Sequence, residues 1–270
     1  MTELLGTDFL YRRWDAAPDR AVFLLVHGLG AHTARWDFLA GHFAARGFPS
    51  YGIELRGFGR TPERPRGHID SLRLYEDDIL ALRRLIGTEH PGRKVFLLGE
   101  SLGGLIAFNL AARCPGEFAG QILIAPAFKN GMKFPLSAYF TLTTRLFVQP
   151  RRTVPVPFTS AMCTRDPEYR AVMDASPDEL REASLKLLMS SMSEQRRARK
   201  AAPATAVPVL FLAPGDDRLV DERAGQKLFA RIGPAEKKLI EYPDMLHALS
   251  IELGRERVFD DILEWVEHRI

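Results

Sequence analysis

The sequence of 270 residues has little of several features that mark specialised protein classes. Its two cysteines, Cys114 and Cys163, lie far apart and outside any C-x-x-C spacing, so nothing indicates a disulfide framework or a zinc site. The formal net charge of +3 is too small to predict nucleic acid as a partner. No run of about 18 apolar residues exists, so no membrane-spanning helix is expected.

The first residues also lack the pattern of a signal peptide. The stretch MTELLGTDFLYRRWD mixes acids and arginines among its apolar residues, where a signal peptide has a basic start followed by an apolar core. The apolar fraction of 46% and the charged fraction of 26% are ordinary for a globular protein. We therefore expect a soluble, cytoplasmic protein, and nothing in the sequence implies a partner protein.

Short continuous apolar runs alternate with amphipathic stretches of helical length. Runs that are apolar throughout predict strands covered on both faces, and their alternation with helices predicts an α/β fold. We expect a doubly wound, mostly parallel sheet with helices on both faces, and the opening residues are compatible with an antiparallel edge strand. Gly47 and Gly87 follow two helical stretches and predict where those helices end. The predicted strands are AVFLLVHG (21–28), SYGIEL (50–55), KVFLLG (94–99), GQILIAP (120–126), VPVLFLAPG (207–215) and KKLIEYP (237–243).

The alternation stops between residues 127 and 205, where no clear buried strand is found. We interpret 127–205 as a mostly helical insertion into a core domain formed by 1–126 and 206–270. The insertion contains apolar residues that either line a substrate tunnel or pack the insertion onto the core, among them Met132, Phe134 and Phe140. It also carries basic clusters at 151–152 and 196–200, which indicate a solvated face or a transient contact with a membrane surface.

A glycine-flanked serine stands where the predicted strand 94–99 turns into a helix. In GESLGG, Ser101 has Gly99 and Gly103 on either side, which is the Gly-x-Ser-x-Gly pattern of a nucleophile elbow. Such a turn exposes the hydroxyl and aims the first N–H groups of the next helix at it. We therefore predict that Ser101 is a nucleophile.

A serine hydroxyl needs a general base, and the base needs an acid that orients it. His247 follows the last predicted strand, and aspartates follow the strand before it, so both lie at the carboxyl edge of the sheet. Neighbouring side chains usually point apart, so at most one of Asp216 and Asp217 meets the imidazole, and we favour Asp217. Asp221 and Asp244 lie nearby.

An oxyanion formed at this serine needs two main-chain N–H donors. The residue after the nucleophile, Leu102, is expected to supply one, and Leu29, in the loop after the strand 21–28, the other. A buried carboxylate at Glu100 must be paired or protonated, and Arg56 is a plausible partner.

Five segments, in this order along the chain, resemble the α/β-hydrolase superfamily, and more narrowly the monoacylglycerol lipase and lysophospholipase-like serine hydrolases. They are VHGLGAHTARWDFLA, YGIELRGFGRT, GESLGGLIA, APGDDRLVD and YPDMLHALSIE. The resemblance implies an α/β-hydrolase fold with 127–205 as its cap, and it assigns the "DRLVD" aspartate to Asp217. It implies Ser101, His247 and Asp217 as catalytic residues, Leu29 and Leu102 as oxyanion donors, and a lipid ester as substrate, with no metal or organic cofactor.

Other reactions remain open on this fold. A thioesterase, a carbon–carbon hydrolase, a cofactor-free perhydrolase or a non-catalytic binding relative would share the scaffold, because fold alone does not fix function. Dehalogenases and epoxide hydrolases are disfavoured because they have aspartate where this chain has Ser101. Many relatives have histidine before the nucleophile where this chain has Glu100.

Overall fold

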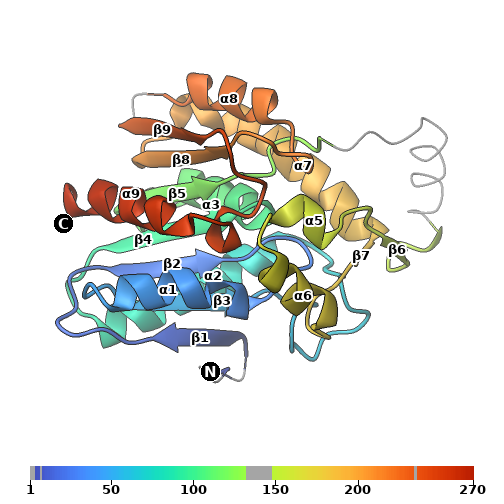
Figure 1. The fold of residues 1–270 in the computed structure, drawn as a ribbon, viewed down its shortest axis with the longest axis horizontal. Helices are drawn as coiled ribbons and strands as arrows, with labels where there is room; N and C mark the ends of the chain where they lie inside the picture. Colours follow the sequence, from blue (N-terminus) through green and yellow to red (C-terminus); the bar gives the residue numbers. More distant parts are fainter. Residues whose placement is uncertain (1–3, 7, 132–147, 234–235) are drawn as a thin grey trace.

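The apolar runs form the strands of a seven-stranded sheet in the computed structural model, which describes residues 4–6, 8–131, 148–233 and 236–270 (Figure 1). The strand order is β1-β3-β2-β4-β5-β8-β9, and only β1 runs antiparallel to its neighbour. Every residue of β2, β3, β4, β5 and β8 is buried, which explains why these runs are apolar throughout. The strands span Leu10–Trp14 (β1), Val22–Val26 (β2), Ser50–Glu54 (β3), Val95–Glu100 (β4), Gly120–Ile124 (β5), Val209–Pro214 (β8) and Lys237–Tyr242 (β9).

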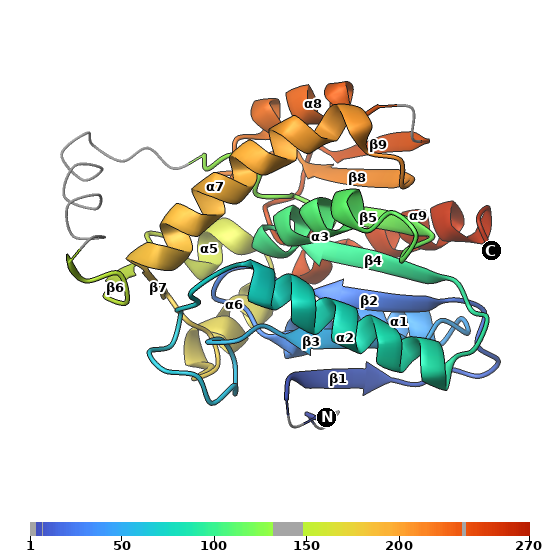
Figure 2. The ribbon, with the colours of Figure 1, turned by 180° about the vertical axis from the view of Figure 1, so that it is seen from behind.

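Helices cover both faces of this sheet, which confirms the predicted doubly wound, mostly parallel α/β architecture. Helices α1 (Asp37–Ala44) and α9 (Arg255–Glu267) lie on the face seen in Figure 1. Helices α2 (Arg73–Glu89) and α3 (Leu102–Arg113) lie on the opposite face, seen in Figure 2, and α8 (Glu222–Arg231) packs into the same apolar core as these two. Two 3₁₀ turns, Thr33–Trp36 (η1) and Leu249–Ile251 (η3), follow β2 and β9 along the chain.

One predicted helix end was wrong. Helix α2 continues through Gly87 to Glu89, and the His90 N–H then bonds to the Ile86 carbonyl at 2.8 Å. Leu82 and Ile86 of α2 are fully buried in the apolar core between this helix and the sheet. Packing of this apolar face keeps the last turn helical despite the low helix propensity of glycine.

The described residues between β5 and β8 lie beyond the carboxyl ends of the parallel strands, apart from α7, which runs back along the sheet (Figures 1 and 2). No buried strand was expected here, yet β6 and β7 form a two-stranded antiparallel pair. Each has only three residues, too few for a sequence signal, and β7 lies inside a stretch that was read as helical. The elements are β6 (Thr153–Pro155), α5 (Ser160–Cys163), α6 (Pro167–Ala175), β7 (Glu182–Ser184), α7 (Leu185–Ala201) and η2 (Ala202–Ala204).

No helix in the described ranges is both long and apolar enough to cross a membrane.

Helix α3 approaches β2 so closely that only glycine fits at one position. A Cβ atom on Gly103 would lie 2.1 Å from the Val26 carbonyl oxygen and 2.7 Å from that of His27. By contrast, a Cβ atom on Gly41 in α1 would meet nothing within 4 Å. The two glycines therefore form a matched pair for testing this contact.

We predict that Gly103→Ala lowers the free energy of unfolding by roughly 3 kcal/mol, because α3 must move away from β2. Gly41→Ala should raise it by about 0.5–1 kcal/mol, because alanine favours the helix without a clash. Urea unfolding followed by circular dichroism measures both changes. Equal stability of the two variants would contradict the close approach.

Candidate active site

Ser101 is the single residue between the end of β4 and the start of α3, and its backbone conformation is strained. Its φ of 57° and ψ of −118° are unusual for a residue with a side chain. The turn is held because the Ser101 N–H donates to the Ile124 carbonyl at 2.9 Å and its carbonyl accepts from Leu105 at 3.1 Å. A Cβ atom on Gly99 would lie 2.3 Å from the Gly103 carbonyl oxygen, so the flanking glycines are what allow this turn.

His247 lies in the loop after β9 and is oriented by one aspartate. Its Nδ1 lies 2.7 Å from Asp217 Oδ2, and Asp217 Oδ1 accepts the N–H groups of Leu219 (2.8 Å) and Val220 (3.0 Å). Because the carboxylate accepts at every contact, Nδ1 carries the proton and Nε2 is left as the basic nitrogen. Asp216 instead pairs with Arg218 at 3.2 Å, and both of these side chains are more than half exposed.

Burial and charge act in opposite directions on this pair. Burial alone would lower the pKa of His247, but the facing Asp217 carboxylate outweighs it and raises that pKa above its ordinary value. Burial would likewise raise the pKa of Asp217, yet His247 and two N–H donors together lower it. The arrangement therefore keeps Asp217 ionised and makes His247 a stronger base than a free imidazole.

Ser101, His247, Leu29 and Leu102 all line one cavity, which encloses about 800 Å³ of empty space, part of it open to solvent. Within the described ranges, the N–H groups of Leu29 and Leu102 donate no hydrogen bond to another group. Two free N–H groups beside a hydroxyl and an imidazole are the groups that acyl transfer requires. The chain between β5 and β8 contributes Val156, Phe158, Cys163, Leu188, Ser191 and Gln195 to the lining.

The three substrate-lining predictions, Met132, Phe134 and Phe140, lie outside the described residues.

The predicted partner of Glu100 was wrong. Arg56 follows β3 and pairs with Asp78 of helix α2, with 2.6 Å between Arg56 Nε and Asp78 Oδ2. Glu100 instead accepts two hydrogen bonds from Ser250, one from its N–H (3.2 Å) and one from its hydroxyl (3.0 Å). Sequence analysis had no signal for this contact because 150 residues separate the two partners.

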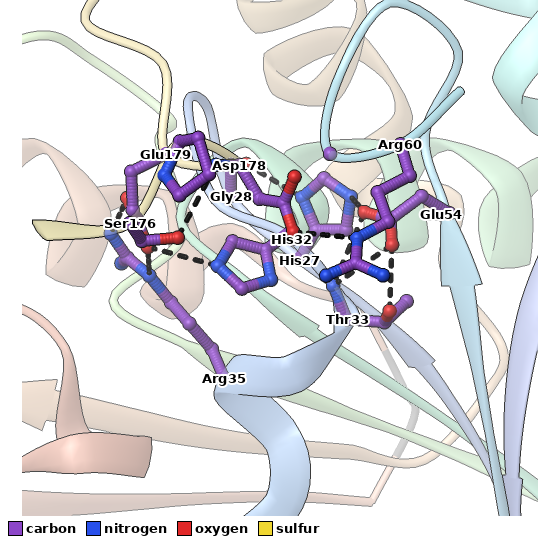
Figure 3. A network of polar contacts seen from close by, with 12 residues as sticks. His27, Gly28, His32, Thr33, Arg35, Glu54, Arg60, Ser176, Asp178 and Glu179 are labelled. Carbon is purple, nitrogen blue, oxygen red and sulfur yellow. Dashed lines mark hydrogen bonds and ion pairs between the residues drawn. The ribbon is translucent and has the colours of Figure 1, made fainter. Parts of the chain in front are cut away.

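A buried ion pair that sequence analysis also missed joins the core to the inserted chain. Arg35 in η1 donates two hydrogen bonds to Glu179, at 2.7 and 2.5 Å, and both side chains are less than a tenth exposed (Figure 3). His32 Nε2 lies 3.6 Å from the same carboxylate, and the Leu180 N–H donates to the Gly30 carbonyl at 2.8 Å. Arg35 also lines the cavity, so the inserted chain neutralises the charge of a cavity residue.

No group of three or more side chains in the described part of the chain is arranged to hold a metal ion.

Comparisons with known proteins point to one group. A family model described as "Serine aminopeptidase, S33" (Hydrolase_4) matches residues 17–254. The chain is 29% identical to the monoacylglycerol lipase of Mycolicibacterium smegmatis, over 97% of this chain and 93% of that protein. It is also 29% identical to the human monoglyceride lipase, over 93% of this chain and 83% of that protein.

Solved structures agree with these sequence matches. The crystal structure of a monoacylglycerol lipase from Paleococcus ferrophilus superposes with a TM-score of 0.88 at 25% identity, covering 98% of this chain and 100% of that one. A soluble variant of the monoglyceride lipase from Saccharomyces cerevisiae, in complex with a substrate analogue, gives 0.86 at 23% identity, covering 100% and 95%.

The contacts of Asp217 predict how an amide would fail in its place. An asparagine can satisfy Leu219 and Val220 with its oxygen only by turning its NH₂ group to His247, which forces the wrong imidazole tautomer. We expect Asp217→Asn to lower kcat for p-nitrophenyl butyrate hydrolysis by roughly 10³- to 10⁴-fold without unfolding the chain. The adjacent Asp216→Asn is the matched control and should retain near-native kcat. Equal losses in both variants would contradict the assignment.

Proposed function

The chain belongs to the Hydrolase_4 family of α/β-hydrolases, and from this membership we propose that Ser101, His247 and Asp217 are its nucleophile, general base and orienting acid. The chain is a serine ester hydrolase. The observation that carries the proposal is that a hydroxyl, an oriented imidazole and two free N–H groups line one cavity. Leu29 and Leu102 are the proposed oxyanion donors.

The reaction follows from these positions as a two-step acyl transfer. His247 Nε2 takes the proton of Ser101 as Oγ attacks the ester carbonyl, and the N–H groups of Leu29 and Leu102 stabilise the oxyanion. His247 then gives the proton to the leaving alcohol. Water, deprotonated by the same imidazole, cleaves the acyl-enzyme and restores Ser101.

We propose that the ester is a monoacylglycerol. Relatives at 29% identity carry the names monoacylglycerol lipase and monoglyceride lipase. The cavity lining includes apolar side chains that suit an acyl chain, such as Phe158 and Leu188. It also includes Arg35, which is already neutralised by Glu179, and the carboxyl group of Glu100. A neutral glycerol group meets no charge conflict there, whereas a phosphodiester would lie near Glu100 without a free cation.

We further propose that residues 127–205 act as a cap, because described parts of this segment line the cavity. Some of its basic side chains remain exposed for contact with a lipid surface, such as Arg199 and Lys200 on α7, whereas Arg197 pairs with Glu76 at 3.3 Å. An acyl chain beside Met132, Phe134 and Phe140, a cytoplasmic location, and the lack of nucleic-acid and protein partners all stay predictions.

We predict that kcat/KM for 1-monooleoylglycerol exceeds that for 1-oleoyl-lysophosphatidylcholine at least roughly tenfold. The reason is that the phosphate of the second substrate would be buried beside the Glu100 carboxylate without a cation to pair with, which raises the free energy of binding. Release of oleic acid, measured by mass spectrometry, tests this, and Ser101→Ala should abolish both reactions. Equal or inverted preference would favour a lysophospholipase instead. One relative, 28% identical, carries the name phospholipase YtpA, from Bacillus subtilis. A preference for oleoyl thioesters would favour a thioesterase.

A further inference from the structure

Glu100 is a buried acidic residue to which the proposed mechanism gives no step. It directly precedes Ser101, is 4% exposed and lines the cavity together with His247. Both of its carboxylate oxygens are bonded to one residue, because Oε1 accepts the Ser250 N–H and Oε2 accepts the Ser250 hydroxyl. An acid in this position costs desolvation free energy, which its contacts must offset.

The loop that carries His247 has to cross a large part of the sheet. His247 follows β9 at the sheet edge, whereas Ser101 follows β4, and β5 and β8 lie between them. At the usual spacing of neighbouring strands, this separation is about 14 Å. The loop therefore extends over residues 243–254 before α9 begins, and its position depends on contacts outside β9.

Besides Asp217, which binds His247 itself, two buried carboxylates hold this loop. Glu252, inside the loop, accepts the N–H groups of Leu246 and of Arg165 in the inserted chain, both at 3.0 Å. Glu100 lies on the other side and binds Ser250, three residues after His247. The Glu100 contact connects the loop directly to the strand end that carries the nucleophile.

We propose that Glu100 is a positioning residue: by binding Ser250, its carboxylate fixes the His247 loop against the Ser101 turn. This inference rests on the proposed function, because it takes His247 as the general base. Glu100 lines the cavity but neither gives nor takes the transferred proton in this account. Its effect reaches the reaction through His247.

The charge of Glu100 also acts on the pKa of His247, together with the other groups that face the imidazole. Asp217, from the loop after β8, and Glu100, at the end of β4, raise the pKa of His247, whereas burial and Arg35, from η1, lower it. Cys163, from α5, lines the same cavity as a buried thiol whose pKa is raised to about 11, so it carries no charge at neutral pH. Catalysis needs neutral His247, so the rate falls as the pH drops through that pKa. Burial raises the pKa of Glu100 above its ordinary value, although His247, Arg35 and Ser250 oppose that shift. Replacing the ionised form of Glu100 by a neutral residue therefore moves the decline in rate to lower pH.

The test compares Glu100→Gln with the native chain by two readouts. The first is the pH profile of kcat/KM for p-nitrophenyl butyrate, and the second is the titration of His247 followed by NMR, which needs no substrate. In Glu100→Gln the amide still offers one acceptor to Ser250, so we expect a folded chain whose acid limb and His247 titration both move to lower pH. At a pH below the native midpoint, it should retain several-fold more of its own plateau rate than the native chain does.

Two further variants separate charge from position. Ser250→Ala keeps the carboxylate but loses one bond, so we expect kcat to fall roughly tenfold, KM to change little and the acid limb to stay in place. Glu252→Gln neutralises a carboxylate that holds the same loop but is not among the charges that shift His247, so its acid limb should also stay in place.

The outcomes distinguish this inference from the proposed function. An unchanged His247 titration in Glu100→Gln, or native kcat in Ser250→Ala, would overturn the inference. If Glu100→Gln fails to fold, Ser250→Ala alone decides. If instead Ser101→Ala hydrolyses the ester as fast as the native chain, the proposed function fails, while the NMR titration still tests the effect of Glu100 on His247.

Discussion

The hydrogen bond from His247 Nδ1 to Asp217 Oδ2, at 2.7 Å, joins the loops that follow β8 and β9, the last two strands at one edge of the sheet. It fixes the imidazole of His247, which lines the same cavity as Ser101. The rest of the site then depends on distance, because Ser101 stands two strands further in, at the end of β4. The fold meets this constraint with a long loop after β9 and with the contact between Ser250 and Glu100.

The chain between β5 and β8 is bonded to the core close to the site. Buried carboxylates link it to the core at two places, Glu179 to Arg35 and Glu252 to the Arg165 N–H. Removing one partner of the buried Arg35–Glu179 pair costs about 3–5 kcal/mol, since the other charge is left unpaired. Glu252 also binds the N–H of Leu246, the residue before His247. A displacement of the segment at Arg165 would therefore shift the backbone next to His247. Glu252 thus connects the position of this segment to the position of the loop that carries His247.

Features encoded locally could be predicted from the sequence. The apolar runs gave the strands of the sheet, and the glycines around Ser101 gave a turn whose geometry only glycine neighbours permit. Features that depend on distant partners could not be predicted. Arg35 and Glu179 are 144 residues apart, so nothing in the local sequence around either residue indicates that they pair. The partner of Glu100 was wrongly assigned to Arg56 for the same reason, since burial alone says that a carboxylate needs a partner but not which one.

The most direct test of the central claim is covalent labelling of the native chain with a long-chain alkyl fluorophosphonate, followed by peptide mass mapping. Such reagents phosphonylate a serine only where a base activates it and N–H groups stabilise the oxyanion. The account predicts one adduct, on Ser101, formed rapidly at neutral pH. No adduct, or an adduct on another residue, would contradict it.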